Sequence, residues 1–372
     1  MNLSLQARLY PTIEQSRLLM AHCYEYISTV NVLVAAIDSD ILPENASTKD
    51  FTAALPSKVK NQALRDAHSV WKRSLELGVI PVLKKPICQW NNQCWYIEQN
   101  ELKLPVYRNG EVEKIAIPCA SIELEGKKGM LRIKKKRGKW IADITITLPD
   151  PQRAEAEGIM GVDLGIKVPA VAHVPGKRTR FFGNGRYQRM MRRRFYAERK
   201  ALQRAGKVRA VRKRQGKEIR WMRNINHQLS RQVVNYARQQ GVGVIRLEKL
   251  TGIRRGTTRK SRGAKARKNN RMMNTWSFYQ LMTFISYKAE RLGIRIELVD
   301  PADTSKACPV CQEKNTADDR TYICRSCGWM GHRDAVGAIN ISRRTGVHGH
   351  SVRATGARGS ARGGLPETAH EL

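Results

Sequence analysis

Two short apolar segments of this chain each carry one acidic residue, and this pattern constrains the fold more than any other. Asp163 stands in Gly-Val-Asp-Leu-Gly at 161–165, and Glu248 ends an apolar run at 242–248. Both segments are typical of buried strands, where an unpaired charge is costly. A third acid, Asp334, lies in the first turn of a helix expected at 333–344. If the strands are neighbours and the helix packs beside them, the three carboxylates converge.

Converging carboxylates would repel one another and raise their pKa values, unless divalent cations lie between them. Two hard cations about 3.5–4 Å apart would suit these oxygens, activate a water and stabilise the leaving oxygen of a phosphodiester. Each acid also has a simpler interpretation. Asp163 can be a cap or an ion-pair partner, Glu248 can pair with Lys249 on the surface, and Asp334 can cap its helix. Their order and elements together favour a metal-dependent nuclease.

Four cysteines form a second constellation, C-x2-C-x12-C-x2-C, made of Cys308, Cys311, Cys324 and Cys327. Two such turns complete a tetrahedron around Zn²⁺, and four thiolates leave no open position, so we expect a structural zinc. His332 is an alternative ligand. Basic residues beside the cysteines would hold a nucleic-acid strand near the carboxylates: Lys306, Lys314, Arg320 and Arg325.

The charge of the chain indicates a polyanionic partner. Its 372 residues carry 68 basic and 32 acidic side chains, a formal charge of +36. Such a charge opposes compaction unless a polyanion neutralises it, and phosphate contacts make nucleic acid the first candidate. A membrane surface is the alternative. We find no uninterrupted apolar run of spanning length and no signal-peptide pattern, so we expect a cytoplasmic protein that does not associate with membranes.

Basic residues concentrate in two expected helices, at about 186–204 and 210–240, and in an expected mobile loop at 252–271. Charge runs on helices are often only solvated faces. Acidic residues are scarce in this region, however, and a duplex lying along the helices explains the excess better. Such contacts would read the backbone and its shape rather than the base sequence.

The N-terminal half predicts strands interrupted by helices. Residues 3–10 alternate as a strand does, and Thr12 with Gln15 has the spacing of a capping box at the start of a helix. A second helix is expected at 57–77, ended by Gly78. The period changes to two between 82 and 148, which indicates a small β-barrel or sandwich. The inward residues expected of the second helix are Leu64, Ala67, Trp71 and Leu75.

Several motifs together resemble the TnpB family, the RNA-guided nucleases encoded by insertion sequences and ancestral to the type V CRISPR effectors. Besides the cysteines, the motifs are Leu-Tyr-Pro-Thr at 9–12, Gly-Val-Asp-Leu-Gly-Ile at 161–166, Leu-Glu-Lys-Leu at 247–250, Pro-Ala-Asp-Thr-Ser at 301–305, Arg-Asp at 333–334 and Gly-Ala-Ile-Asn-Ile at 337–341. They cover the C-terminal half densely and the N-terminal half sparsely. One departure is Val336, where the commonest family form has Asn.

The resemblance implies an α/β multidomain protein with an RNase H-like (RuvC) nuclease domain at 158–304 and 329–345. A zinc-ribbon insert, the target-strand module, would occupy 305–328. A wedge β-barrel would comprise 1–11 and 79–157, with a helical recognition insert at 12–78, and 346–372 would be a disordered tail.

The resemblance also implies roles for the site residues and for the partners. Asp163, Glu248 and Asp334 would be catalytic and would bind Mg²⁺, as the two ions expected from the carboxylates, and the four cysteines would bind structural Zn²⁺. A noncoding guide RNA would pair with double-stranded target DNA beside a short adjacent motif. We expect a monomer in complex with RNA.

Three other functions remain open from the sequence. A type V CRISPR effector nuclease would have the same fold, and the genomic neighbourhood distinguishes it from a transposon protein. A guided DNA-binding protein without cleavage would need the loss of a carboxylate, and all three are present. A DNA transposase shares the RNase H fold but does not account for the cysteines and the basic helices.

Overall fold

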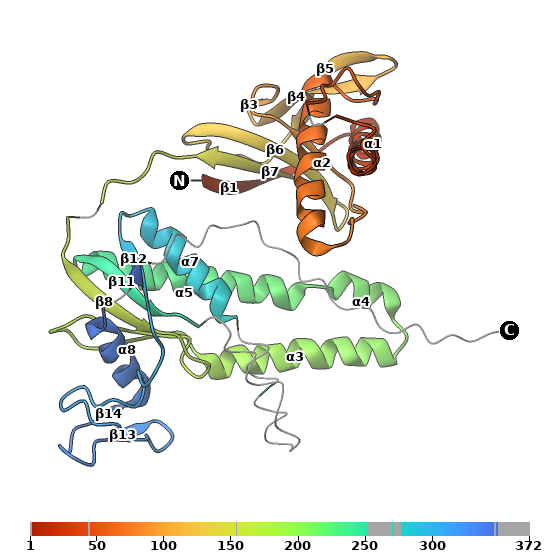
Figure 1. The fold of residues 1–372 in the computed structure, drawn as a ribbon. Helices are drawn as coiled ribbons and strands as arrows, with labels where there is room; N and C mark the ends of the chain where they lie inside the picture. The colour runs from red at the N-terminus through yellow and green to blue at the C-terminus, as the bar shows by residue number, and fades with distance from the viewer. Residues whose placement is uncertain are drawn as a thin grey trace. The chain divides into compact units, whose positions relative to one another are not determined.

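The computed structural model describes residues 2–43, 45–153, 155–250, 270 and 277–345, together with the backbone of 347–348. Tertiary contacts divide the chain into two units, Met1–Asp150 and Pro151–Leu372 (Figure 1). Both units combine helices with sheets, which agrees with the expected mixed α/β fold of several domains. Nearly all of the expected loop at 252–271 and of the expected tail lies outside the described residues. The backbone at 347–348, within that tail, forms a short strand.

Unit 1 contains two sheets and two helices within its described residues. The four-stranded sheet has the order β1-β7-β6-β2, and the three-stranded sheet has the order β3-β4-β5. The elements are β1 (Asn2–Leu9), α1 (Ile13–Asp38), α2 (Ser57–Leu77), β2 (Ile87–Trp90), β3 (Tyr96–Glu98), β4 (Glu101–Arg108), β5 (Glu111–Pro118), β6 (Lys127–Lys136) and β7 (Lys139–Thr147).

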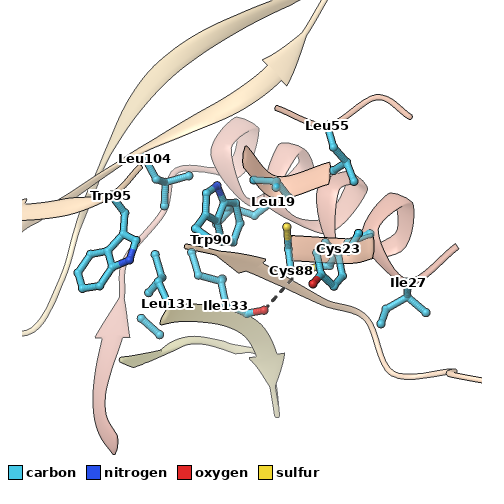
Figure 2. Packing of buried hydrophobic residues seen from close by; sticks show 14 of the residues in the cluster. Leu19, Cys23, Ile27, Leu55, Cys88, Trp90, Trp95, Leu104, Leu131 and Ile133 are labelled. Atoms are coloured by element: carbon cyan, nitrogen blue, oxygen red, sulfur yellow. Dashed lines mark hydrogen bonds between the residues drawn. The ribbon is translucent and has the colours of Figure 1, made fainter. Parts of the chain in front are cut away.

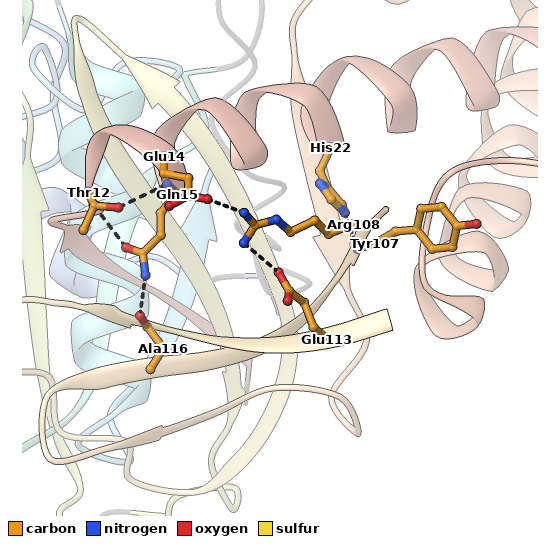
Figure 3. Close-up of polar contacts among 8 residues, drawn as sticks. All are labelled: Thr12, Glu14, Gln15, His22, Tyr107, Arg108, Glu113 and Ala116. Carbon is orange, nitrogen blue, oxygen red and sulfur yellow. Dashed lines mark hydrogen bonds and ion pairs between the residues drawn. The ribbon is translucent and has the colours of Figure 1, made fainter. Parts of the chain in front are cut away.

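Helix α1 begins as its sequence predicts. The Thr12 side chain accepts a hydrogen bond from the Gln15 backbone, and the Gln15 side chain accepts one from the Thr12 backbone (Figure 3). This capping box satisfies two backbone donors that the first turn would leave without partners. Further along α1, apolar residues pack onto the sheet in one core, where Leu19, Cys23 and Trp90 are fully buried (Figure 2).

Two expectations for the helices of unit 1 are wrong. Leu75 is 63% exposed rather than inward, because the last turn of α2 buries Ser74 instead. Helix α1 is long and apolar enough to cross a membrane by length and composition, contrary to the expected absence of such a segment. This is weak evidence for a membrane span, because the core helix of a soluble protein passes the same test, and half of that apolar window is buried.

Unit 2 is built on a sheet of order β10-β9-β8-β11-β12-β15. Strands β8 and β11 are parallel, as are β11 and β12, whereas β9 runs antiparallel to β8. The described elements are β8 (Gly158–Asp163), β9 (Ala170–His173), β10 (Arg180–Phe182), α3 (Gly185–Arg204), α4 (Val208–Arg214), α5 (Lys217–Gln239), β11 (Val242–Glu248), α7 (Phe278–Glu290), β12 (Arg295–Val299), β13 (Thr321–Ile323), β14 (Met330–His332), α8 (Arg333–Arg343) and β15 (Val347–His348).

The second basic helix is broken, which corrects the prediction of one helix over 210–240. Helix α4 ends at Arg214, and α5 begins at Lys217 after Gly216, whose φ of 67° is not helical. Glycine reaches this conformation without the cost that a side chain adds. Downstream of the break, Ile219 is exposed, whereas Met222, Leu229 and Val233 are buried.

Candidate functional site

Asp163 and Glu248 lie at the same edge of the sheet. Each is the last residue of its strand, β8 and β11, and these strands are parallel neighbours in which Val162 lies opposite Leu247. The carboxyl ends of parallel neighbours meet at one edge, so the next residue of each strand brings the two carboxylates together. The structure thus brings together the two strand acids that the sequence singled out.

Helix α8 packs directly on β8 and brings Asp334 to the same place. A Cβ at Gly161 would overlap the backbone of Ala338 and Ser342, so only glycine permits this approach. Gly337 faces the Asp163 side chain, because a Cβ there would lie 3.0 Å from Asp163 Oδ2. Asp334 is one turn earlier in the helix and is buried.

The first turn of α8 orients Asp334 through two neighbours. The His332 ring accepts a hydrogen bond at Nδ1 from the Asp334 N–H (3.2 Å) and so caps the helix. His332 is therefore engaged outside the cysteine cluster, unlike the alternative in which it binds zinc. The Arg320 guanidinium, from the segment between the cysteine pairs, forms an ion pair with Asp334 Oδ1. Asp334 Oδ2 is buried and has no hydrogen-bond partner among the described residues.

The surroundings of Asp163 disfavour its charged form. Burial, and then the nearby Glu248 and Asp334 carboxylates, raise the pKa of Asp163 to about 8. Arg333 and Arg320 oppose this effect in part. Burial also raises the pKa of Glu248, while a hydrogen bond from Thr304 lowers it. Two other carboxylates thus act on Asp163, and such pKa shifts are characteristic of functional sites.

Thr304 and Asn340 support Glu248 and are absent from the candidate residues chosen from the sequence. The Thr304 hydroxyl donates a hydrogen bond to Glu248 Oε1. The buried Asn340 amide donates to the backbone oxygens of Thr304 (2.8 Å) and Ala307 (2.7 Å), and so ties that loop to α8. Both residues belong to motifs on which the family resemblance rests, at 301–305 and 337–341. Membership in these motifs was the one feature of the sequence that could have indicated a role for them.

Arg246 fixes the other end of α8. Its side chain donates a hydrogen bond to the Ser342 oxygen (2.8 Å) and pairs with the buried Glu297 (2.9 Å). Arg246 precedes Glu248 by two residues on β11, so both side chains lie on the same face of the sheet. The strand that carries Glu248 therefore also anchors the helix that carries Asp334.

The four predicted cysteines converge as a possible metal site. The Sγ atoms of Cys308, Cys311, Cys324 and Cys327 all lie within 4.8 Å of one another. Cys308 and Cys324 are buried and pack with Tyr322 and Val336 in a small core. Val336 belongs to α8, and its apolar side chain fills this core two residues after Asp334. The hairpin of β13 and β14 adjoins the cluster and extends to His332.

The basic helices present more cations than their acids can neutralise. Glu198 pairs with Arg194 and Arg214, and Glu218 pairs with Arg192. Trp221 holds α5 against α3 through ring contacts with Tyr187 and Phe195. Helix α3 has only Gly185 buried and carries the exposed or half-buried cations Arg186, Arg189, Arg192, Arg193, Arg194, Arg199, Lys200 and Arg204.

Comparison with known proteins gives a family model that matches within unit 2 and curated relatives that match parts of the chain. Residues 278–341, which hold the four cysteines and Asp334, match the family model "Cas12f1-like, TNB domain". A "CRISPR-associated endodeoxyribonuclease Cas12f1" of Sulfoacidibacillus thermotolerans is 28% identical over 228 residues, 56% of this chain and 50% of that protein. The "TnpB-like protein MJ0751" of Methanocaldococcus jannaschii is 32% identical over 131 residues, 35% of this chain and 45% of that protein. This chain spans about half the length of these curated relatives.

One solved structure is similar over most of the chain. CasPhi-2 (Cas12j) bound to crRNA and phosphorothioate-DNA aligns with a TM-score of 0.50 and 10% identity, over 92% of this chain and 91% of that chain. At this identity the likeness concerns the fold, and it agrees with a mixed α/β protein of several domains.

Proposed function

We infer that this chain, which is a TnpB- and Cas12f-like protein, acts as an RNA-guided DNA endonuclease that depends on Mg²⁺. The observation that carries the inference is the convergence of Asp163, Glu248 and Asp334 at one edge of the sheet. A guide RNA and double-stranded target DNA would be its partners, and the excess of cations on α3 and α5 is suited to a guide–target duplex. We further propose a cytoplasmic protein that acts as a monomer with its RNA.

The topology of unit 2 supports an RNase H-like (RuvC) domain. Three strands joined in antiparallel order, β8 to β10, are followed by the parallel strands β11 and β12, and α8 covers the strand that carries Asp163. In this proposal the domain comprises 158–304 and 329–345, with 305–328 as the zinc-binding target-strand module. The wedge domain would comprise 1–11 and 79–157, nearly all of it in unit 1, and the helical recognition insert at 12–78 would lie within unit 1.

The three acids fit divalent cations by two observations. Asp334 Oδ2 is buried without a hydrogen-bond partner, and such an oxygen is costly unless a cation or donor satisfies it. Burial, and after it the Glu248 and Asp334 carboxylates, raise the pKa of Asp163, and a cation among the three acids would offset both effects. When bound, Mg²⁺ would activate a water for attack on a phosphodiester and stabilise the leaving oxygen.

The residues around the acids would prepare them for this role. Thr304 holds one oxygen of Glu248 and thereby orients the other. Arg320 pairs with Asp334 and belongs to the cysteine-bearing segment, so it links the zinc module to the acids. Four thiols in reach of one ion fit Zn²⁺, which would fix the segment that carries Arg320.

Cleavage by the reconstituted complex tests the function. The protein is expressed with its native flanking DNA, and the RNA that copurifies is sequenced. With this RNA, the complex should cut a matched plasmid in Mg²⁺ and not in EDTA. Asp163→Asn, which keeps the size of the side chain, should lower the cleavage rate by at least about a thousandfold while RNA binding persists.

Three results would contradict the proposal. Cleavage in EDTA would show that the reaction does not require a divalent metal. Full activity of Asp163→Asn would show that the reaction does not require this carboxylate. Target binding by the wild-type complex without any cutting would favour the guided binder that does not cleave.

A further inference from the structure

An open cleft of about 470 Å³ lies in unit 1, where β1, the start of α1 and the β6–β7 hairpin meet. It is named the Tyr10 cleft here and is lined by Arg8, Tyr10, Arg17, Lys135, Lys139 and Trp140, among others. Pairing of the strands assembles it, because Trp140 lies opposite both Leu9 of β1 and Lys135 of β6. Its volume falls within the range of small-ligand sites.

The charged side chains of the Tyr10 cleft are all positive. Arg8, Arg17, Lys135 and Lys139 are exposed, and none of them has a carboxylate partner among the described residues. Cations without counter-charge attract phosphates. The N-terminal end of helix α1 adds little to the attraction for phosphate, because the capping box already uses the N–H groups of Thr12 and Gln15. The attraction therefore comes from the side chains.

An exposed aromatic ring stands among these cations. Tyr10 is 49% exposed and lines the cleft, and the Arg8 guanidinium lies 4.9 Å from its ring centroid. Trp140 forms a fixed wall, since it is buried and its Nε1 donates a hydrogen bond to Ser16 Oγ (2.9 Å). An exposed aromatic ring beside unpaired cations is the combination that binds unpaired nucleotides.

We propose that the Tyr10 cleft binds an unpaired nucleotide of RNA. The base stacks on the exposed ring of Tyr10, and Arg17, Lys135 and Lys139 hold the neighbouring phosphates. RNA is favoured over DNA because the Tyr10 hydroxyl has no hydrogen-bond partner among the described residues and can bond a ribose 2′-hydroxyl. The assignment rests on the proposed function, in which a guide RNA supplies the nucleotide.

Photocrosslinking of the full-length protein tests the cleft. The probe is a 12-nucleotide oligouridine with one central 4-thiouridine, and crosslinked peptides are mapped by mass spectrometry. Crosslinks should fall on residues 8–17 or 135–140. Base stacking predicts that Tyr10→Ala lowers the yield there by about five- to 150-fold. Tyr24→Ala is the matched control, because Tyr24 is 60% exposed on α1 and does not line the cleft.

A second variant separates RNA from DNA. Oligothymidine with one 4-thiothymidine should crosslink to the cleft less than the RNA probe does. Tyr10→Phe keeps the ring and should abolish that difference while crosslinking persists. Circular dichroism checks folding, and Tyr10→Phe tests the cleft even if the alanine variant unfolds.

Several outcomes would overturn the assignment. They are an absence of crosslinks in the cleft, an unchanged yield in Tyr10→Ala, and equal crosslinking of RNA and DNA by the wild-type protein. The probe requires neither Mg²⁺ nor a matched target. A protein that failed to cut DNA would still crosslink, and a protein without crosslinks could still cut, so the two proposals fail separately.

Discussion

Gly337 and Asp163 lie in direct contact, such that a Cβ at position 337 would approach Asp163 Oδ2 to 3.0 Å. The two residues are 174 positions apart in the chain (337 minus 163) and meet because α8 lies against β8. The missing side chain at 337 therefore leaves room for the carboxylate.

Gly337→Ala should displace the Asp163 carboxylate by a few tenths of an ångström. We expect cleavage to fall by about tenfold or more, because small misplacements of reacting groups are costly. Alanine favours a helix over glycine by about 1 kcal/mol, so the melting temperature should not fall much. Cleavage rates and thermal unfolding are measured together. Wild-type cleavage, or loss of activity only in step with unfolding, would count against this role of Gly337.

The metal-free protein should lose stability as the pH rises from about 4 to about 8. The pKa of Asp163 is about 8 in the folded state against 3.8 for the ordinary group. Between these values the unfolded chain releases a proton that the folded protein keeps, so ionisation favours unfolding. The slope from this group is at most about 1.4 kcal/mol per pH unit.

Urea unfolding of the wild type and of Asp163→Asn, without metal, isolates this contribution. The difference between the two proteins should change across that pH range, and Mg²⁺ should reduce the loss in the wild type. Parallel pH profiles for the two proteins would show that Asp163 ionises as an ordinary carboxyl group.

Disruption of the zinc site should lower both the bound zinc and the rate of cleavage. Cys308 and Cys324 share a small core with Val336 of α8, so loss of the ion should disturb the helix that carries Asp334. Cys324→Ser should lower bound zinc, measured by elemental analysis, and reduce cleavage at least tenfold, an order-of-magnitude expectation for a structural zinc ligand. Cys94→Ser is the control, since Cys94 lies outside the cluster. Unchanged zinc in Cys324→Ser would contradict the assignment of the site.

Acid should destabilise unit 1 through His22. Its Nδ1 donates a hydrogen bond to the Leu18 oxygen (3.0 Å). Its Nε2 accepts one from the N–H of Tyr107 (2.8 Å), and both of these residues are drawn in Figure 3. Burial lowers the pKa of His22 below 6.5. The stabilisation is therefore present above pH 6.5 and is lost as the pH falls through the folded-state pKa.

His22→Gln provides the test, because glutamine can accept the Tyr107 N–H without titrating. Its unfolding free energy should depend less on pH between 7 and 5 than that of the wild type. The slope from His22 is at most about 1.4 kcal/mol per pH unit. An identical pH dependence in both proteins would exclude His22 as its source.

Features carried by a few neighbouring residues were predictable from the sequence. The capping box of Thr12 and Gln15, the end of α2 at Gly78 and the paired cysteines all depend on contacts within a few positions. The positions of Asp163 and Glu248 at strand ends follow from apolar periodicity in the same way. Their meeting point followed only from the resemblance and from the assumption that the strands are neighbours.

The local sequence pattern was insufficient to predict the structure where one stretch of sequence is compatible with two conformations. The basic stretch at 210–240 has helical periodicity throughout, yet Gly216 adopts a positive φ and interrupts it. Leu75 has the spacing of the inward face of α2 but lies beyond the surface that the core of unit 1 covers. Burial depends on what packs against a helix, and periodicity does not supply that partner.

The sequence by itself determined the elements, the kinds of side chain at their ends and the cysteine spacing, because backbone geometry and short-range hydrogen bonds act over a few residues. Only the tertiary structure decided that Gly161 and Gly337 admit α8 to the strand, that Thr304 holds Glu248 and that Arg320 pairs with Asp334. These contacts join distant parts of the chain. Their geometry is set by how closely whole elements pack, which no short stretch of sequence encodes.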